Sequence, residues 1–144
     1  MTVFPDGTKE ALHGHQYVPT VTVEVQIGHL IPFSDVKAAM KKISEAWDEK
    51  VLLAEKNAHF QVIKKSKASI HFRLCKKEYL LPIDEVVFLP ISNVICEELA
   101  QVYSHLLAKY LPALKKAPFL SWSVDIEESP GQGATYTISN RVKS

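Results

Sequence analysis

The chain has 144 residues, of which 47% are hydrophobic and 23% are charged, and its formal net charge is +1. This composition is ordinary for one globular domain with a sizeable core, and the near-neutral charge excludes a global field that would recruit nucleic acid or a membrane surface. With no apolar run long enough to span a bilayer, no signal-peptide pattern, and only two cysteines without a CxxC motif, we expect a single domain over residues 1–144 in a reducing, cytoplasmic setting.

The first chemically distinctive segment is His13-Gly14-His15, with Glu10 three residues upstream. Side chains alternate across an extended strand, so both histidines point to the same face and can offer two imidazoles to one metal ion. A catalytic zinc usually takes three protein ligands. The pair alone therefore leaves two interpretations open, a metal site or a turn and strand without a ligand.

Residues 16–27 alternate and predict a half-buried strand. One face carries the apolar positions Tyr17, Val21, Val23, Val25 and Ile27. His13 and His15 share the parity of this face, so regular pairing would turn them inward. Inward histidines beside a core strand need a partner, which favours a site.

A helix is predicted over residues 34–50, with Ser34 placed to cap its N-terminus. Apolar residues recur at helical spacing at Val36, Ala39, Met40, Ile43 and Trp47. The opposite side carries Lys37, Lys41, Lys42 and Glu45. These lysines form either a solvated face or a phosphate-binding surface.

Short extended pieces follow at about 59–63, 69–75 and 78–81, and we interpret them as an added hairpin at about 58–81. A second helix is predicted over residues 93–110, and Pro112 follows it. Its apolar stripe is Ile95, Leu99, Val102, Tyr103, Leu106 and Tyr110.

The closing hairpin carries a second chemical signal. In residues 120–128, Leu120, Trp122, Val124 and Ile126 form one face, and Glu128 is the next residue on it. This carboxylate either escapes at the strand end or is kept inward to bind something. Gly131-Gln132-Gly133 predicts a turn, since no helix follows it to make a phosphate cradle, and residues 134–142 predict the last strand.

The order of these motifs resembles the 6-pyruvoyl-tetrahydropterin synthase family. The resemblance spans about residues 4–138 and rests on five segments: HGHQY, FSDVKAAMKK, WDEKVLL, LPISNVICEEL and VDIEESPGQGATY. It implies the α+β tunnelling fold, in which an antiparallel four-stranded sheet carries two helices between strands 2 and 3, and trimers stack into hexamers. In this chain only Thr2–Phe4 could belong to the first strand, which is short or missing.

The resemblance also implies a zinc site. His13 and His15 match two of the three zinc-binding histidines, and the third position falls at or before Met1, where this sequence has none. The remaining histidines, His29, His59, His71 and His105, do not match it. A carboxylate or water would then have to complete the metal shell, and Glu10 is a candidate.

Glu10 matches a glutamate that replaces the family's cysteine in a subfamily with an E-x-L-H-G-H pattern. The resemblance makes Glu10 and Asp48 the catalytic residues, although Glu49 stands where the histidine of the family's Asp-His pair is expected. A carboxylate desolvated in such a pocket would have its pKa raised toward neutrality, as suits a general base.

The resemblance assigns the pterin end of the pocket to Glu128, which would accept from the N2 amino and N3 groups of the ring. Cys96 and Glu97 are the other substrate-binding candidates. Cys96 is otherwise interpreted as a small residue that packs at the start of a helix.

The activity implied is that of a zinc-dependent lyase acting on the side chain of 7,8-dihydroneopterin triphosphate. Its product would be 6-hydroxymethyl-7,8-dihydropterin, 6-pyruvoyl-tetrahydropterin or both. A non-catalytic pterin binder or oligomeric scaffold is the alternative, and the missing cysteine weakens a third interpretation, a carboxy-tetrahydropterin synthase. The partners implied are a small pterin and further copies of the chain, in a trimer or hexamer, with no nucleic acid and no membrane.

Overall fold

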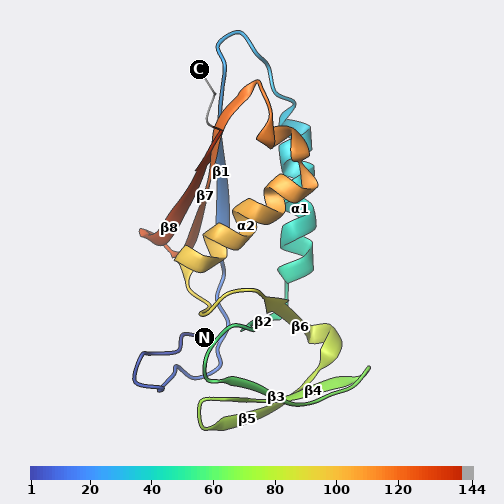
Figure 1. Cartoon of the computed structure of the whole chain (residues 1–144), viewed down its shortest axis with the longest axis vertical. Helices are drawn as coiled ribbons and strands as arrows, with labels where there is room; N and C mark the ends of the chain where they lie inside the picture. The colour runs from blue at the N-terminus through green and yellow to red at the C-terminus, as the bar shows by residue number, and fades with distance from the viewer. Residues whose placement is uncertain (141–144) are drawn as a thin grey trace.

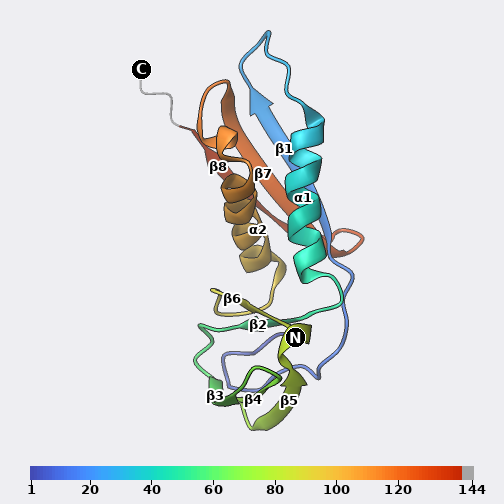
Figure 2. The same cartoon turned by 90° about the vertical axis from the view of Figure 1, so that its right-hand side faces the viewer.

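The structure is a computed structural model that describes residues 1–140. In chain order its elements are β1 (Val18–Val25), α1 (Phe33–Trp47), β2 (Val51–Ala54), β3 (Phe60–Lys65), β4 (Ser69–Leu74), β5 (Lys77–Pro82), η1 (Ile83–Glu85), β6 (Val86–Leu89), α2 (Cys96–Tyr110), η2 (Pro112–Lys115), β7 (Phe119–Ser129) and β8 (Gln132–Ser139). Helices α1 and α2 lie against one face of the sheet formed by β1, β7 and β8 (Figure 1). The short strands β2 to β6 gather at the far end of the helices, beside the N-terminus (Figure 2).

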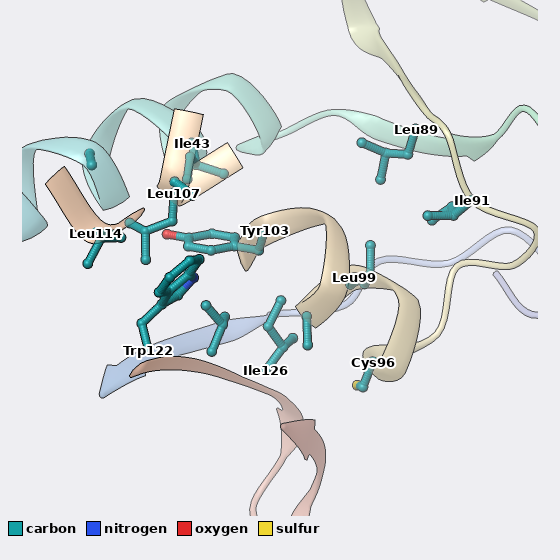
Figure 3. Close-up of a cluster of buried hydrophobic side chains, with 14 of the residues drawn as sticks. Ile43, Leu89, Ile91, Cys96, Leu99, Tyr103, Leu107, Leu114, Trp122 and Ile126 are labelled. Atoms are coloured by element: carbon teal, nitrogen blue, oxygen red, sulfur yellow. The ribbon is translucent and has the colours of Figure 1, made fainter. Parts of the chain in front are cut away.

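The main sheet is antiparallel, in the order β1-β7-β8, and its alternating pattern sets the core. In β1 every second residue is half-buried, as predicted, although Ile27 lies beyond the strand and is fully exposed. Strand β7 contributes the buried side chains of Trp122, Val124 and Ile126, which pack against α2 (Figure 3). The indole Nε1–H of Trp122 donates to the Oγ of buried Ser104 over 2.9 Å, so the one polar atom of that ring is satisfied inside the core.

The expected four-stranded sheet is not confirmed, since the main sheet has three strands among residues 1–140. Val3 instead forms an isolated bridge with Lys9. A tight turn causes this reversal: the Asp6 carboxylate accepts from the Thr8 backbone N–H at 2.9 Å, and Gly7 adopts a φ of +78°. Residues 2–10 therefore double back on themselves.

Both helices are shorter than predicted. Helix α1 begins at Phe33 after Pro32 at the N-cap position, so Ser34 is not the cap. It ends at Trp47 rather than 50, and Glu49 adopts a left-handed φ of +54° that a helix cannot continue. Helix α2 begins at Cys96 rather than 93, because Ile95 is extended. Its stripe is correct at Leu99 and Tyr103, whereas Tyr110 is exposed at the helix end.

The central third of the chain forms two small sheets. The pieces expected as a hairpin are β3, β4 and β5, which pair as a three-stranded antiparallel sheet. Strands β2 and β6 pair in parallel and were not predicted. A second core of Leu53, Ile70, Phe72 and Leu74 lies between these sheets.

The chain closes through β8, which begins at Gln132, two residues earlier than predicted. Residues 141 and 142 of the predicted strand lie outside the described residues. Pro130 and Gly131 form the turn before β8, with Gly131 at a φ of +76°. No helix in the described part of the chain combines the length and apolar character needed to cross a membrane.

Candidate functional site

The two histidines of the HGH segment converge on one point. His13 Nε2 and His15 Nε2 lie 2.6 Å apart, and His13 Nδ1 lies 2.7 Å from the carbonyl oxygen of Ala11. A carbonyl can only accept, so His13 Nδ1 is the donor in this contact, and its Nε2 faces Nε2 of His15. Both residues lie just before β1, outside its regular pairing. His13 is exposed, so the expectation that it turns inward is wrong, whereas the side chain of His15 is only 25% exposed.

Glu10 completes a cluster that could hold a metal ion. One ligand atom from each of Glu10, His13 and His15 lies within 4.8 Å of the others. Two imidazoles and one carboxylate are a known donor set for zinc, and nitrogens about 2.0 Å from a tetrahedral zinc are about 3.3 Å apart. The imidazoles would need to separate by less than about 1 Å, so the donor set fits zinc.

Hydrogen bonds within the N-terminal segment fix the position and charge of Glu10. The backbone N–H of Thr2 donates to Glu10 Oε2 over 2.9 Å, and the backbone N–H of Glu10 donates to the carbonyl of Thr2 over 3.0 Å. The bonds from Thr2 hold the pKa of Glu10 below its usual value, with smaller contributions from the N-terminal amine and His13. The expected rise of the Glu10 pKa is therefore wrong: the carboxyl is hydrogen-bonded rather than desolvated.

Glu128 approaches the same cluster from the end of β7. Its Oε2 lies 3.8 Å from His15 Nδ1, and its side chain is 35% exposed. Glu127 pairs with Gly133 and Ser129 pairs with Gln132, so Glu128 occupies an irregularity in the β7–β8 register. A bulge re-aims the side chain that it carries. The sequence left open whether Glu128 turns to solvent at the strand end or is kept inward. In the structure it lies beside His15.

A cavity of about 810 Å³ adjoins the histidine pair. Its wall includes both histidines and, from the turn that follows α1, Asp48 and Glu49. Lys41 also reaches this wall, although the Lys41 side chain pairs with Glu45 at 3.6 Å and both are exposed. The structure thus brings Asp48 to the same cavity as His13 and His15.

Cys96 and Glu97 start α2 and are not part of that wall. Cys96 is 8% exposed. Burial raises the pKa of its thiol, and the negative charges of Glu128 and Glu97 add to the effect. Cys96 therefore packs near Glu128 as a protonated thiol, as expected for a small residue at a helix start, whereas Glu97 is exposed.

Tyr17 belongs to the site and was not among the predicted site residues. Its ring stacks on His15 with centroids 5.5 Å apart. Burial, reinforced by the charge of Glu128, raises the pKa of Tyr17 to about 12. Tyr17 follows His13 and His15 at a spacing of two, so the same parity that grouped the histidines could have identified it.

Comparisons with known proteins give a consistent result. A family model described as 6-pyruvoyl tetrahydropterin synthase matches residues 2–139. A protein of Methanocaldococcus jannaschii, provisionally assigned as a 6-carboxy-5,6,7,8-tetrahydropterin synthase, is 29% identical over 145 residues, covering 98% of this chain and 88% of that protein.

Solved structures of two Plasmodium proteins are similar throughout. The 6-pyruvoyl tetrahydropterin synthases of Plasmodium falciparum and Plasmodium vivax superpose with TM-scores of 0.85 and 0.83. Each is 25% identical, and the match covers 96% of this chain and 88% of theirs. Two further structures of the Plasmodium vivax enzyme carry alanine or cysteine in place of a glutamate described as a catalytic residue.

Proposed function

This chain belongs to the 6-pyruvoyl tetrahydropterin synthase family, and we propose that it is a zinc-dependent lyase acting on the side chain of 7,8-dihydroneopterin triphosphate. The observation that carries the proposal is the convergence of Glu10, His13 and His15 within 4.8 Å beside a cavity. The product is 6-hydroxymethyl-7,8-dihydropterin, with 6-pyruvoyl-tetrahydropterin as a second possible product.

In this proposal His13 and His15 hold zinc through their Nε2 atoms and water completes the metal shell, so that Glu10 remains free to carry protons. The ion, when bound, lowers the pKa of side-chain hydroxyls of the substrate. His13 is already in the required tautomer, since its Nδ1–H donates to Ala11. His15 Nδ1 faces Glu128 Oε2 at 3.8 Å, which is longer than a direct hydrogen bond, and its Nε2 faces the metal position beside His13 Nε2.

Glu10 is the proposed proton carrier. Glu10 is ionised at neutral pH, with its pKa lowered by the hydrogen bonds from Thr2, and in the proposed reaction it takes the proton of the C2′ hydroxyl. The C1′–C2′ bond breaks, C2′ becomes an aldehyde, and the electron pair enters the dihydropterin ring. Glu10 then returns the proton to C1′, which leaves the hydroxymethyl group. The catalytic glutamate of the Plasmodium vivax enzyme supports this role.

The remaining site residues divide between the two ends of the pocket. Asp48 is proposed as the second catalytic carboxylate, since it lines the cavity beside the histidines. Glu128 is proposed to accept from the N2 and N3 groups of the pterin, a pair of charge-assisted hydrogen bonds. Cys96 and Glu97 are proposed to flank the ring, because Cys96 is buried at the start of α2, close enough to Glu128 for that charge to raise the pKa of its thiol further.

We also propose that the chain, as one domain with the 58–81 insertion, works as a homo-oligomer, a trimer or a hexamer, in the cytoplasm. Three large apolar side chains support assembly: Ile27, Leu30 and Phe33, around the β1–α1 loop, are 103%, 98% and 72% exposed. Such a patch is typical of a contact between protein chains. Cys75 and Cys96 are both free thiols, which supports a reducing compartment.

A non-catalytic family member is the second candidate function. Glu49 at the position of the family's histidine favours it, as does the lack of a third histidine in the cluster formed by the described residues. A carboxy-tetrahydropterin synthase is suggested by the name of the Methanocaldococcus relative. Identification of the product separates these alternatives.

The test measures zinc per subunit and turnover of dihydroneopterin triphosphate in four proteins. Wild type and the control His29→Gln, an exposed loop substitution, should bind about one zinc and turn over. Glu10→Gln should keep zinc and lose roughly 10²–10⁴-fold in rate, whereas His13→Gln should lose both. Zinc below about 0.1 per subunit together with no product in the wild type would overturn the proposal, and loss of zinc from Glu10→Gln would make Glu10 a ligand instead.

A further inference from the structure

The N-terminal strap, residues 1–10, delivers Glu10 to the histidine pair without belonging to the main sheet. It turns at Gly7 and bridges Val3 to Lys9. Its end is closed by the reciprocal hydrogen bonds between Thr2 and Glu10. A short two-stranded ribbon of this kind is only marginally stable in water by itself, so its position must be set by what it contacts.

Asn93 is the side chain that fixes the strap. Its Oδ1 accepts from the backbone N–H of Val3 over 3.0 Å, and its Nδ2 donates to the carbonyl of Val3 over 2.9 Å. Asn93 thus satisfies both backbone groups of one strap residue, as a neighbouring strand would. Val3 is adjacent to Thr2, whose N–H binds the Glu10 carboxylate.

The sheet formed by β3, β4 and β5, together with β2, supplies the surface on which the strap rests. Met1 and Val3 pack against the second core, which β2 and β4 build. The ammonium of Lys9 lies 5.2 Å from the ring centroid of Tyr79 on β5. Both views place the N-terminal segment beside the small strands (Figures 1 and 2). The strap is therefore held on one side by Asn93 and on the other by the insertion.

We propose that Asn93 is a positioning residue, which places the Glu10 carboxylate at the histidine pair through Val3 and Thr2 while touching neither substrate nor metal. The proposal rests on the proposed function in that Glu10 is taken as the proton carrier. It also assigns a role to the 58–81 insertion, since the second core and Tyr79 hold the strap in place.

The experiment compares Asn93→Ala, Asn93→Asp and Asn140→Ala. Asn140 is the matched control, because it too makes two hydrogen bonds to the backbone, in this case from its Nδ2 to the carbonyls of Leu114 and Phe119, away from the strap. Site-resolved hydrogen exchange follows the Val3 and Glu10 amides. Steady-state kinetics separates kcat from KM.

Asn93→Ala should speed exchange of both amides about tenfold or more and lower kcat roughly 10- to 100-fold at unchanged KM, as loss of a residue that orients a functional group does. Asn93→Asp should fall between wild type and Asn93→Ala in both exchange rate and kcat, because its carboxylate still accepts from the Val3 N–H but cannot donate to the Val3 carbonyl. In a Glu10→Gln background, Asn93→Ala should cause no further loss of kcat. Asn140→Ala should match wild type in both measurements.

Unchanged exchange of the Glu10 amide in Asn93→Ala overturns the proposal, and so does an equal response to Asn140→Ala. Faster exchange with an unaltered kcat overturns it as well, since Asn93 would then be structural only. If the wild type shows no turnover, the proposed function fails. The hydrogen-exchange rate of the Glu10 amide in Asn93→Ala then decides whether Asn93 holds the strap.

Discussion

Replacement of Glu128 by glutamine tests the proposed role of this residue in binding the pterin ring. A carboxylate presents acceptors to both the N2 amino and the N3 group of the ring. The isosteric amide presents one neutral acceptor and one NH₂ group, which would meet a donor. Glu128→Gln therefore removes charge-assisted bonding and sets two donors against each other, while the shape of the site is kept.

The cost can be worked from the contacts. A hydrogen bond to a charged group contributes about 1.5–3 kcal/mol, and an unpaired donor costs about 1–3 kcal/mol. Because the Glu128 side chain is 35% exposed, water relieves part of this cost, and we expect a loss of about 2–4 kcal/mol. At 1.4 kcal/mol per factor of ten, pterin affinity should fall roughly 30- to 700-fold.

The assay is calorimetric titration of 7,8-dihydroneopterin into the zinc-loaded protein. Glu127→Gln is the matched control, since Glu127 is the preceding half-buried glutamate of β7 and stays in regular register with Val18 and Gly133. Its affinity should stay within about threefold of wild type, a change below about 1 kcal/mol. Equal losses for the two variants, or an affinity of Glu128→Gln close to wild type, would refute the assignment.

Three other predictions concern the framework of the site. Ser104→Ala leaves the buried indole N–H of Trp122 without a partner, so the free energy of unfolding measured with denaturant should fall by about 1–3 kcal/mol. A fall below about 0.5 kcal/mol, the size typical of a surface substitution, would contradict this prediction. Gly133→Ala places a Cβ 2.5 Å from the carbonyl oxygen of Ile126, so it should lower stability. It should also weaken pterin binding, because Gly133 pairs with Glu127 next to the bulge that carries Glu128. A wild-type affinity in the titration with dihydroneopterin would count against this. Hydrogen bonds from Arg73 and then His71 lower the pKa of Glu78, so its contribution to stability is complete above its ordinary value of 4.5 and is lost as the pH falls through the lowered pKa. Glu78→Gln should therefore flatten the decline of unfolding free energy below pH 4.5, and an unchanged slope would show that the ion pairs carry no net linkage.

The parts of the fold that sequence predicted well have a strong period. Alternation in β1 and β7 predicted which side chains are buried, and helical spacing predicted the buried face of α1 at Val36, Ala39 and Ile43. Strands β2 and β6 were not predicted, because their sequences, Val-Leu-Leu-Ala and Val-Val-Phe-Leu, do not alternate between apolar and polar residues, as is usual for paired parallel strands. Helix ends were misplaced where backbone conformation decides them, as with the positive φ of Glu49.

The candidate site divides in the same way. Parity and spacing grouped Glu10, His13 and His15, and the parity of β7 singled out Glu128. Sequence could not predict how Glu10 is held, because the partner that fixes its strap is Asn93, 90 residues from Val3. The lowered pKa of Glu10 has the same origin, since it arises from a turn that brings Thr2 back onto Glu10.

The central claim, zinc-dependent cleavage of a pterin side chain, is tested most directly by one turnover measurement. Dihydroneopterin triphosphate is incubated with the protein as purified, after chelation, and after zinc is restored, and the pterin products are identified by mass. The account predicts 6-hydroxymethyl-7,8-dihydropterin in the first and third samples and none in the second. The account would be contradicted if chelation left the amount of product unchanged, or if no sample contained a pterin product.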